Sequence, residues 1–253
     1  MIDEMTVVEQ LANRRERAGV FLDVDGTLAP IVARPELARV LPEVPSILER
    51  LSAHLRVVAL ISGRRSGDVR TLIDVPGVEI VGTHGLERLD ALDPATLSEV
   101  EAVAVTVGAW VEPKGAAAAV HFRALPDPER AMEAAAGPLT AVAVAHGLEL
   151  VPGKAILELM PVGAPRKGDA VGSLVETADL RAVVFAGDDV GDLDAFRALE
   201  GFRTAGLWTC SVAAGGPEVS PAVVEAADLV VEGPQGVAAL LSAIADRLER
   251  GTG

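Results

Sequence analysis

Short apolar segments along the chain predict buried β-strands. The clearest one, residues 182–186, runs directly into a glycine and several aspartates. A second apolar run, 20–22, lies between Gly19 and Gly26. Short apolar runs bounded by turn residues are typical of strands buried on both faces of a sheet. Further strands of this kind are expected at 56–61, 78–81 and 228–231.

Between these strands, apolar residues recur with the spacing of an α-helix. One such stripe lies within residues 44–51, and another lies near the end of the chain, within 240–248. Strands that alternate with helices indicate an α/β fold with a parallel sheet. Further helices are expected over 5–18, 66–73, 169–178 and 192–200.

The pattern changes in the middle of the chain. Two strand-like runs joined at Pro152-Gly153-Lys154 indicate a hairpin, so this part is expected to be antiparallel and of mixed α+β type. We therefore predict that 89–164 is a second domain, inserted into a core made of 1–88 and 165–253. Its predicted strands are 117–122, 148–151 and 155–160, and its predicted helices are 97–110 and 128–146, with a kink or break at Pro138.

The composition narrows the class of protein. With 50% hydrophobic and 23% charged residues, the 253-residue chain is globular. The 22 basic and 37 acidic residues give a net charge of −15, which argues against a nucleic-acid-binding surface. A single cysteine excludes a disulfide framework within the chain and fits a reducing cytoplasm. We expect a cytoplasmic protein without a membrane partner, because no stretch approaches the roughly 20 apolar residues of a membrane-spanning helix.

Two aspartates one residue apart, Asp23 and Asp25, directly follow the predicted strand at 20–22. In an open parallel sheet, ligands bind beyond the carboxyl ends of the strands. Two neighbouring carboxylates repel each other unless a cation neutralises them or one is protonated. Mg²⁺ takes oxygen ligands, usually one or two carboxylates together with a substrate phosphate. The pair therefore indicates a Mg²⁺-assisted phosphoryl-transfer site, although an acidic turn without chemistry has the same composition.

Other predicted strand ends and helix starts carry polar residues that complete such a site. In phosphoryl transfer, a carboxylate nucleophile divides hydrolysis into two easier steps, and a second acid protonates the leaving oxygen and activates water. A hydroxyl and a lysine can hold the phosphate. Residues of these types are Ser62 after the strand at 56–61, Lys167 before the helix at 169–178, and Asp188, Asp189 and Asp192 after the strand at 182–186.

These segments, in this order, resemble the four motifs of the haloacid dehalogenase (HAD) superfamily of phosphatases. The resemblance implies a Rossmann-like parallel-sheet core with an inserted α+β cap domain of the C2 type. It also implies that Asp23 is the nucleophile and Asp25 the general acid and base. The implied phosphate-binding residues are Ser62, Gly63 and Lys167, and the implied Mg²⁺ ligands are Asp23, the backbone carbonyl of Asp25, Asp188 and Asp192.

Within 89–164, the segments 110–114, 120–123 and 157–161 resemble cap motifs of the trehalose-6-phosphate phosphatases, one family of that superfamily. The resemblance implies hydrolysis of trehalose 6-phosphate in trehalose biosynthesis and a functional link to a trehalose-6-phosphate synthase. Carboxylates and an ammonium group can accept from and donate to sugar hydroxyls. The implied contacts to the distal glucose ring are Glu112, Lys114 and Glu158, and the further candidates for substrate binding are Arg123 and Lys154.

The chain departs from the family pattern at positions that bear on the substrate. Met160 stands where an arginine is common, and Gly191 and Leu193 replace a usual threonine and glutamate. Two alternatives follow. One is a phosphatase with the same cap type that acts on sucrose phosphate or mannosyl-3-phosphoglycerate, whose anionic glycerate would require extra basic residues. The other is a catalytically silent copy that binds or regulates; loss of Asp23, Asp25 or Lys167 would favour it, and all are present.

Overall fold

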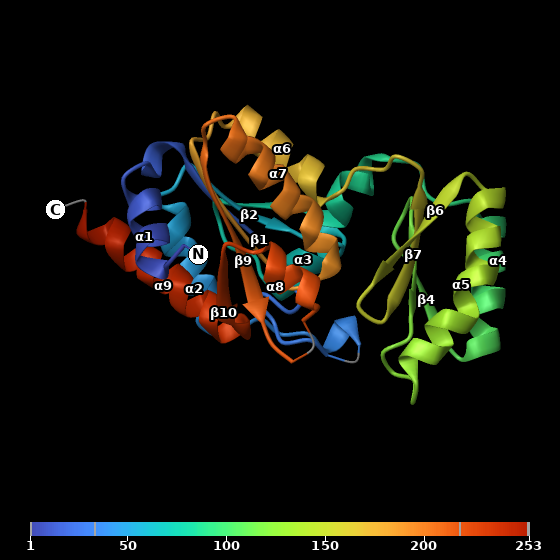
Figure 1. Ribbon diagram of the computed structural model, residues 1–253. Helices are drawn as coiled ribbons and strands as arrows, with labels where there is room; N and C mark the ends of the chain where they lie inside the picture. The colour runs from blue at the N-terminus through green and yellow to red at the C-terminus, as the bar shows by residue number, and fades with distance from the viewer. Residues whose placement is uncertain (1, 33, 218, 252–253) are drawn as a thin grey trace. The chain divides into compact units, whose positions relative to one another are not determined.

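The structure, a computed structural model, describes residues 2–32, 34–217 and 219–251 (Figure 1). It divides into two compact units, which we call the core unit and the inserted unit. The core unit comprises Met1–Ile31, Ala38–His84 and Arg166–Gly253, and the inserted unit comprises Val32–Leu37 and Gly85–Pro165. The insertion predicted at 89–164 therefore lies within the second unit, while residues 32–37, which the sequence analysis left in the core, group with the inserted unit.

The core unit is built on a six-stranded sheet with the order β10-β9-β8-β1-β2-β3. All neighbouring strands in it are parallel, which confirms the predicted α/β class. The strand β9 was not predicted, because Thr209 and Ser211 interrupt its apolar pattern although both are buried. The strands are β1 (Ala18–Leu22), β2 (Val57–Ile61), β3 (Val78–Val81), β8 (Ala182–Gly187), β9 (Trp208–Gly215) and β10 (Leu229–Glu232).

Helices cover both faces of this sheet (Figure 1). Side chains alternate along each strand, so Val20 and Leu22 pack against α1, α2 and α9, whereas Phe21 packs against α6, α7 and α8. With both faces covered by apolar side chains, polar side chains can gather at the strand ends. The helices are α1 (Glu4–Ala12), α2 (Val44–Ser52), α3 (Ser66–Leu72), α6 (Lys167–Thr177), α7 (Leu193–Thr204), α8 (Pro221–Ala226) and α9 (Gly233–Arg250).

The inserted unit contains a four-stranded antiparallel sheet with the order β4-β5-β7-β6. Two helices pack on one face of it, around Phe122 and Leu139 (Figure 1). Across the described residues, no helix combines the length and apolarity needed to cross a bilayer. The elements are α4 (Pro94–Val107), β4 (Trp110–Pro113), β5 (Ala118–His121), α5 (Pro128–Ala145), β6 (Leu148–Gly153) and β7 (Ile156–Pro161).

Two local features of the inserted unit differ from the predicted boundaries. The helix expected over 97–110 ends at Val107, because Gly108 adopts a left-handed backbone with φ of 78° and the short strand β4 begins two residues later. Strand β6 extends to Gly153, which pairs with Ile156 at the start of β7, so the turn between the two strands consists of residues 154 and 155. Ala155 has a φ of 56°, a conformation that glycine adopts more readily than alanine. The helix α5 continues through Pro138.

Candidate active site

The loop after β1 carries the aspartate pair. The amide of Asp23 donates to the carbonyl of Ala186 at 2.9 Å, which holds Asp23 in register with β8. Gly26, in the turn that follows, has a φ of 86°, and a Cβ there would lie 2.1 Å from Oδ2 of Asp188. Only glycine therefore lets the carboxylate of Asp188 pack against the turn that carries Asp23 and Asp25.

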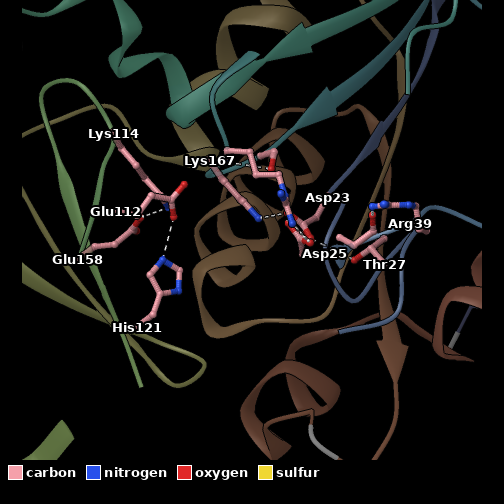
Figure 2. Close-up of polar contacts among 12 residues, drawn as sticks. Asp23, Asp25, Thr27, Arg39, Glu112, Lys114, His121, Glu158 and Lys167 are labelled. Carbon is pink, nitrogen blue, oxygen red and sulfur yellow. Dashed lines mark hydrogen bonds and ion pairs between the residues drawn. The ribbon is translucent and has the colours of Figure 1, made fainter. Parts of the chain in front are cut away.

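Three aspartates from two strand ends gather in what we call the acid cluster: Asp23, Asp188 and Asp192. All three are buried, and each offers a carboxylate oxygen within 4.8 Å of the other two. Lys167, the first residue of α6 and only 6% exposed, joins them. Its Nζ donates to Oδ1 of Asp23 at 2.6 Å (Figure 2). The same Nζ also donates to Oδ1 of Asp192. Side chains that are distant in sequence thus form one charged group at the carboxyl end of the sheet.

Asp192 also shapes the loop after β8. Its Oδ2 accepts from the amides of Asp188 and Asp189, both at 2.9 Å. A Cβ at Gly187 would lie 2.3 Å from Cγ of Asp192, so the close approach of this carboxylate requires a glycine there. The neighbouring Asp189 uses its Oδ1 to accept from the amide of Val190 at 2.8 Å and is not a member of the acid cluster. Asp192 is therefore a structural anchor as well as a candidate metal ligand.

The charges of the acid cluster do not balance. Burial raises the pKa of Asp23 well above its usual value; Lys167 opposes the shift, and the neighbouring carboxylates of Asp192 and Asp188 add to it. Burial also disfavours the charge of Lys167, but Asp192 and Asp23 outweigh it and raise the pKa of its ammonium group. The cluster itself therefore holds three buried carboxyl groups and one ammonium, which contacts two of them.

This donor set fits a hard divalent cation. The cluster offers carboxylate oxygens, the ligands that Mg²⁺ and similar ions prefer, and offers no thiol or imidazole. The glycines at positions 26 and 187 let two of the carboxylates approach the backbone closely. The residues needed to bind a divalent metal are therefore present together in the core unit.

The ends of β2 and β1 meet through an ion pair that the sequence analysis missed. Nε and Nη2 of Arg64 donate to the two carboxylate oxygens of Asp25 at 2.6 and 2.7 Å. Ser62 is buried, and its Oγ accepts from the amide of Arg64 at 3.1 Å, while Gly63 lies half-buried in the bend between them. The sequence did contain a signal for this ion pair: a basic side chain, Arg64, follows Ser62 at the end of β2, and β2 is the neighbour of the strand that leads to Asp25.

In the inserted unit, four residues form what we call the polar cluster: Glu112, Lys114, His121 and Glu158. Nζ of Lys114 donates to Oε1 of Glu158 at 2.6 Å, and Nε2 of His121 lies 2.8 Å from Oε2 of Glu112 (Figure 2). Val111, Val120 and Leu157, the adjacent positions on β4, β5 and β7, face α4 and α5. Because side chains alternate, the polar cluster lies on the opposite face of the sheet.

The remaining predicted substrate residues lie near the β6–β7 turn. Nη2 of Arg123 donates to the carbonyl of Lys154 at 3.1 Å, so the guanidinium ties the segment after β5 to this turn. Met160, at the position where an arginine is common, is 4% exposed and packs with Leu86 and Ala117. It contributes apolar packing and no charge.

Comparisons with known proteins agree with this architecture. A family model described as trehalose-phosphatase matches residues 21–101 and 88–220. Trehalose-6-phosphate phosphatase from Escherichia coli strain K12 is 32% identical over 192 residues, which cover 70% of this chain and 71% of that protein. The C-terminal domain of trehalose-6-phosphate phosphatase from C. albicans has the same fold, with a TM-score of 0.82 at 23% identity over 97% of each chain.

In another relative, the segment that is similar to this chain is a small part of a much longer protein. An uncharacterized glycosyl hydrolase of Mycobacterium tuberculosis (strain CDC 1551 / Oshkosh) is 34% identical over 222 residues, which cover 78% of this chain but only 16% of that protein. The family model nevertheless spans most of the sequence, and the E. coli relative matches over most of both lengths. The chain therefore belongs to the trehalose-phosphatase family.

Proposed function

We propose that this protein is a Mg²⁺-dependent phosphatase that hydrolyses trehalose 6-phosphate to trehalose and phosphate through an aspartyl-phosphate intermediate. Its family membership supports the reaction, and one observation carries the mechanism: the 2.6 Å contact between Lys167 and Asp23 inside the buried acid cluster. A carboxylate nucleophile beside a buried ammonium is suited to attack a phosphorus atom whose oxygens the ammonium binds.

In the first proposed step, a carboxylate oxygen of Asp23 attacks phosphorus, and the bond from phosphorus to the sugar oxygen breaks. Asp25 gives a proton to that oxygen, so that trehalose leaves as a neutral alcohol. In the structure both oxygens of Asp25 accept from the guanidinium of Arg64, so the contact to one oxygen has to open before that oxygen carries the proton. Ser62, the amide of Gly63 and Lys167 hold the phosphate oxygens as their charge redistributes.

In the second proposed step, a water molecule attacks phosphorus and the bond between phosphorus and Asp23 breaks. Asp25 takes a proton from the water, which returns both aspartates to their starting states and releases phosphate. The proposed Mg²⁺ ligands are Asp23, the carbonyl of Asp25 and Asp188, with Asp192 as a further ligand, direct or through water. When bound, the ion supplies positive charge that offsets the repulsion between the nucleophile and the phosphate.

The polar cluster of the inserted unit is proposed to recognise the sugar. Glu112 and Glu158 offer acceptors and Lys114 offers donors, which suits the hydroxyl groups of a neutral disaccharide. Arg123 and Lys154 are proposed as further substrate contacts. On this proposal residues 89–164 are a C2-type cap domain, and 1–88 and 165–253 form the catalytic core.

Phosphate release from a panel of substrates tests the proposal. The panel contains trehalose 6-phosphate, sucrose phosphate, mannosyl-3-phosphoglycerate and p-nitrophenyl phosphate, each with EDTA and with added Mg²⁺. We expect the highest kcat/KM with trehalose 6-phosphate and no turnover in EDTA. Asp23→Asn should abolish turnover with an unchanged circular dichroism spectrum. Near-normal turnover of that variant would reject the covalent mechanism, and a wild-type protein inactive on the whole panel would indicate a silent copy.

We also propose that the protein works in the cytoplasm on a freely diffusing sugar phosphate. The proposed reaction needs an enzyme that supplies trehalose 6-phosphate, so a functional link to a trehalose-6-phosphate synthase follows from the chemistry. Coupled assays with such a synthase test this link, since trehalose should accumulate only when both proteins are present.

A further inference from the structure

The face of the inserted sheet opposite α4 and α5 is organised in cross-strand rows. The register places Glu112 of β4 and Glu158 of β7 on either side of Ala119 in β5. The adjacent row on this face begins with Trp110 of β4, which pairs with His121 of β5. The two carboxylates of the polar cluster thus lie two strands apart, with β5 between them, and an aromatic pair lies directly beside one of them.

Trp110 and His121 stack on each other. Their ring centroids are 4.0 Å apart, and the planes differ by only 5°. Trp110 is 37% exposed, so one large aromatic side chain remains at the surface of the sheet where it holds the imidazole. Stacking over a flat indole restricts rotation of the His121 ring about its side-chain bonds and fixes the plane in which its nitrogens lie.

The fixed imidazole in turn holds Glu112. Nε2 of His121 lies 2.8 Å from Oε2 of Glu112, and an ionised carboxylate can only accept hydrogen bonds, so Nε2 carries the proton. Figure 2 shows the two side chains pointing toward each other from neighbouring strands. The chain of contacts runs from the indole to the imidazole to the carboxylate, and it selects one orientation of a side chain that otherwise rotates about three bonds.

We propose that His121, oriented by Trp110, is a positioning residue that pre-organises Glu112 to accept hydrogen bonds from a sugar hydroxyl. This inference rests on the proposed role of the polar cluster in sugar recognition. A carboxylate held in its binding orientation loses less rotational freedom when the sugar binds, so the contact strengthens binding without touching the reacting phosphate. His121 itself needs no contact with the substrate.

A matched set of variants separates positioning from packing. His121→Phe keeps an aromatic ring to stack on Trp110 and removes the donor, whereas His121→Gln retains an N–H donor at a similar reach. His146→Phe is the control, because His146 belongs to the same unit, contacts Thr96 at 3.0 Å and pairs with Glu99 at 3.3 Å on α4. Steady-state kinetics with trehalose 6-phosphate and p-nitrophenyl phosphate are measured for each variant, together with the melting temperature.

We expect His121→Phe to raise KM for trehalose 6-phosphate roughly tenfold, because the freed side chain of Glu112 must then be ordered when the sugar binds, with a smaller change in kcat. Values for p-nitrophenyl phosphate should stay within twofold of wild type. His121→Gln should recover most of the loss, and His146→Phe should change the melting temperature without changing KM. Added to Glu112→Ala, His121→Phe should cause little further loss, because both variants remove the same interaction.

Equal losses on both substrates, or losses that add fully in the double variant, would overturn the inference and leave His121 a packing residue. Failure of the proposed function has a different signature. If the wild type prefers another sugar phosphate, the same comparison is made with that substrate, and a selective effect of His121→Phe still supports positioning. Turnover of p-nitrophenyl phosphate and of no sugar phosphate would overturn both proposals.

Discussion

The acid cluster of the core unit and the polar cluster of the inserted unit both place carboxylates around a lysine, yet their charges are arranged differently. In the acid cluster, three buried carboxyl groups accompany one ammonium, that of Lys167, which contacts Asp23 and Asp192. In the polar cluster, Lys114 contacts Glu158 and His121 contacts Glu112, so each carboxylate has a basic partner. The first arrangement attracts a cation, and the second suits a neutral ligand.

The two clusters also differ in what positions them. The acid cluster lies on loops after parallel strands, where glycines let carboxylates approach the backbone. The polar cluster lies on one face of an antiparallel sheet, where the strand register sets the spacing of the side chains. Loops at strand ends can enclose an ion from several sides, whereas a sheet face presents a surface to a larger molecule.

Removing the lysine tests the charge difference most strongly. Lys167→Met should abolish turnover and lower the free energy of unfolding by about 3–5 kcal/mol, because the buried Asp23 and Asp192 lose their ammonium partner. Mg²⁺ should restore part of this stability, since it binds the folded cluster. Urea unfolding with and without MgCl₂ measures both effects. Lys114→Met is the control, and a Mg²⁺-dependent rescue of that variant as well would contradict the comparison.

The glycine that fits Asp188 against the aspartate loop is the next test. Gly26→Ala puts a Cβ 2.1 Å from Oδ2 of Asp188 at a φ of 86°, so we expect kcat to fall by about a hundredfold as the cluster shifts. Gly191→Ala serves as the control, since nothing lies within 4 Å of a Cβ at that position. Comparable activity of the two variants would show that the close approach at position 26 is unimportant.

A change in the polar cluster should act on sugar substrates alone. Glu158→Ala leaves the buried Lys114 without its 2.6 Å contact. We expect kcat/KM for trehalose 6-phosphate to fall roughly thirtyfold, which corresponds to a loss of about 2 kcal/mol of transition-state stabilisation. The rate with p-nitrophenyl phosphate should change little. Glu101→Ala, at an exposed position on α4, controls for loss of a carboxylate from the same unit. Similar losses on both substrates would argue against sugar recognition by this cluster.

A third ionic group, around Asp228, has no proposed role in turnover and can therefore be compared with the two clusters. Burial raises the pKa of Asp228, but hydrogen bonds from Arg203 and Ser211 outweigh it and bring the pKa below its usual value. A lowered folded-state pKa gives stability that is present at neutral pH and lost as the pH falls through that value. Asp228→Asn should therefore cost about 2 kcal/mol at pH 7 and progressively less in acid, without a change in turnover. Urea unfolding between pH 7 and pH 3 gives the difference; a cost that stays constant with pH would contradict the ionic origin.

The smallest expected effect concerns the turn between β6 and β7. Ala155 has a φ of 56°, and its carbonyl accepts from the amide of Phe122 at 3.0 Å, a bond that glycine would keep. Ala155→Gly should raise the free energy of unfolding by about 0.5 kcal/mol, because relief of the left-handed backbone exceeds the added freedom of the unfolded chain. Measured destabilisation in urea would show that the turn carries no such strain.

Much of the fold could be predicted because the buried strands have continuous apolar runs. The exceptions have physical causes. In β9, Thr209 and Ser211 are buried among polar partners that come from elsewhere, including Asp228, 17 positions after Ser211. The strand β4 is a short edge strand that contains Glu112 and Pro113, neither of them favourable in strands. In both cases, contacts between distant segments override the local pattern.

The sequence by itself determined which residue types stand at the ends of the strands, and in which order. That was enough to predict aspartates meeting near Lys167, because carboxyl ends of parallel strands share one edge of the sheet. The sequence grouped Glu112, Lys114 and Glu158 in a different way, through resemblance to a family alone. Periodicity says little about which strands of a small antiparallel sheet are neighbours.

Only the tertiary structure decided which groups are partners. Lys167 contacts Asp23 across 144 positions of sequence, Arg64 binds Asp25 across 39, and Lys114 reaches Glu158 across 44. Each pairing depends on strand order, register and the backbone angles of a few glycines, none of which local spacing specifies. Local interactions thus set where polar side chains leave the apolar runs, and long-range packing sets which of them come within hydrogen-bonding distance.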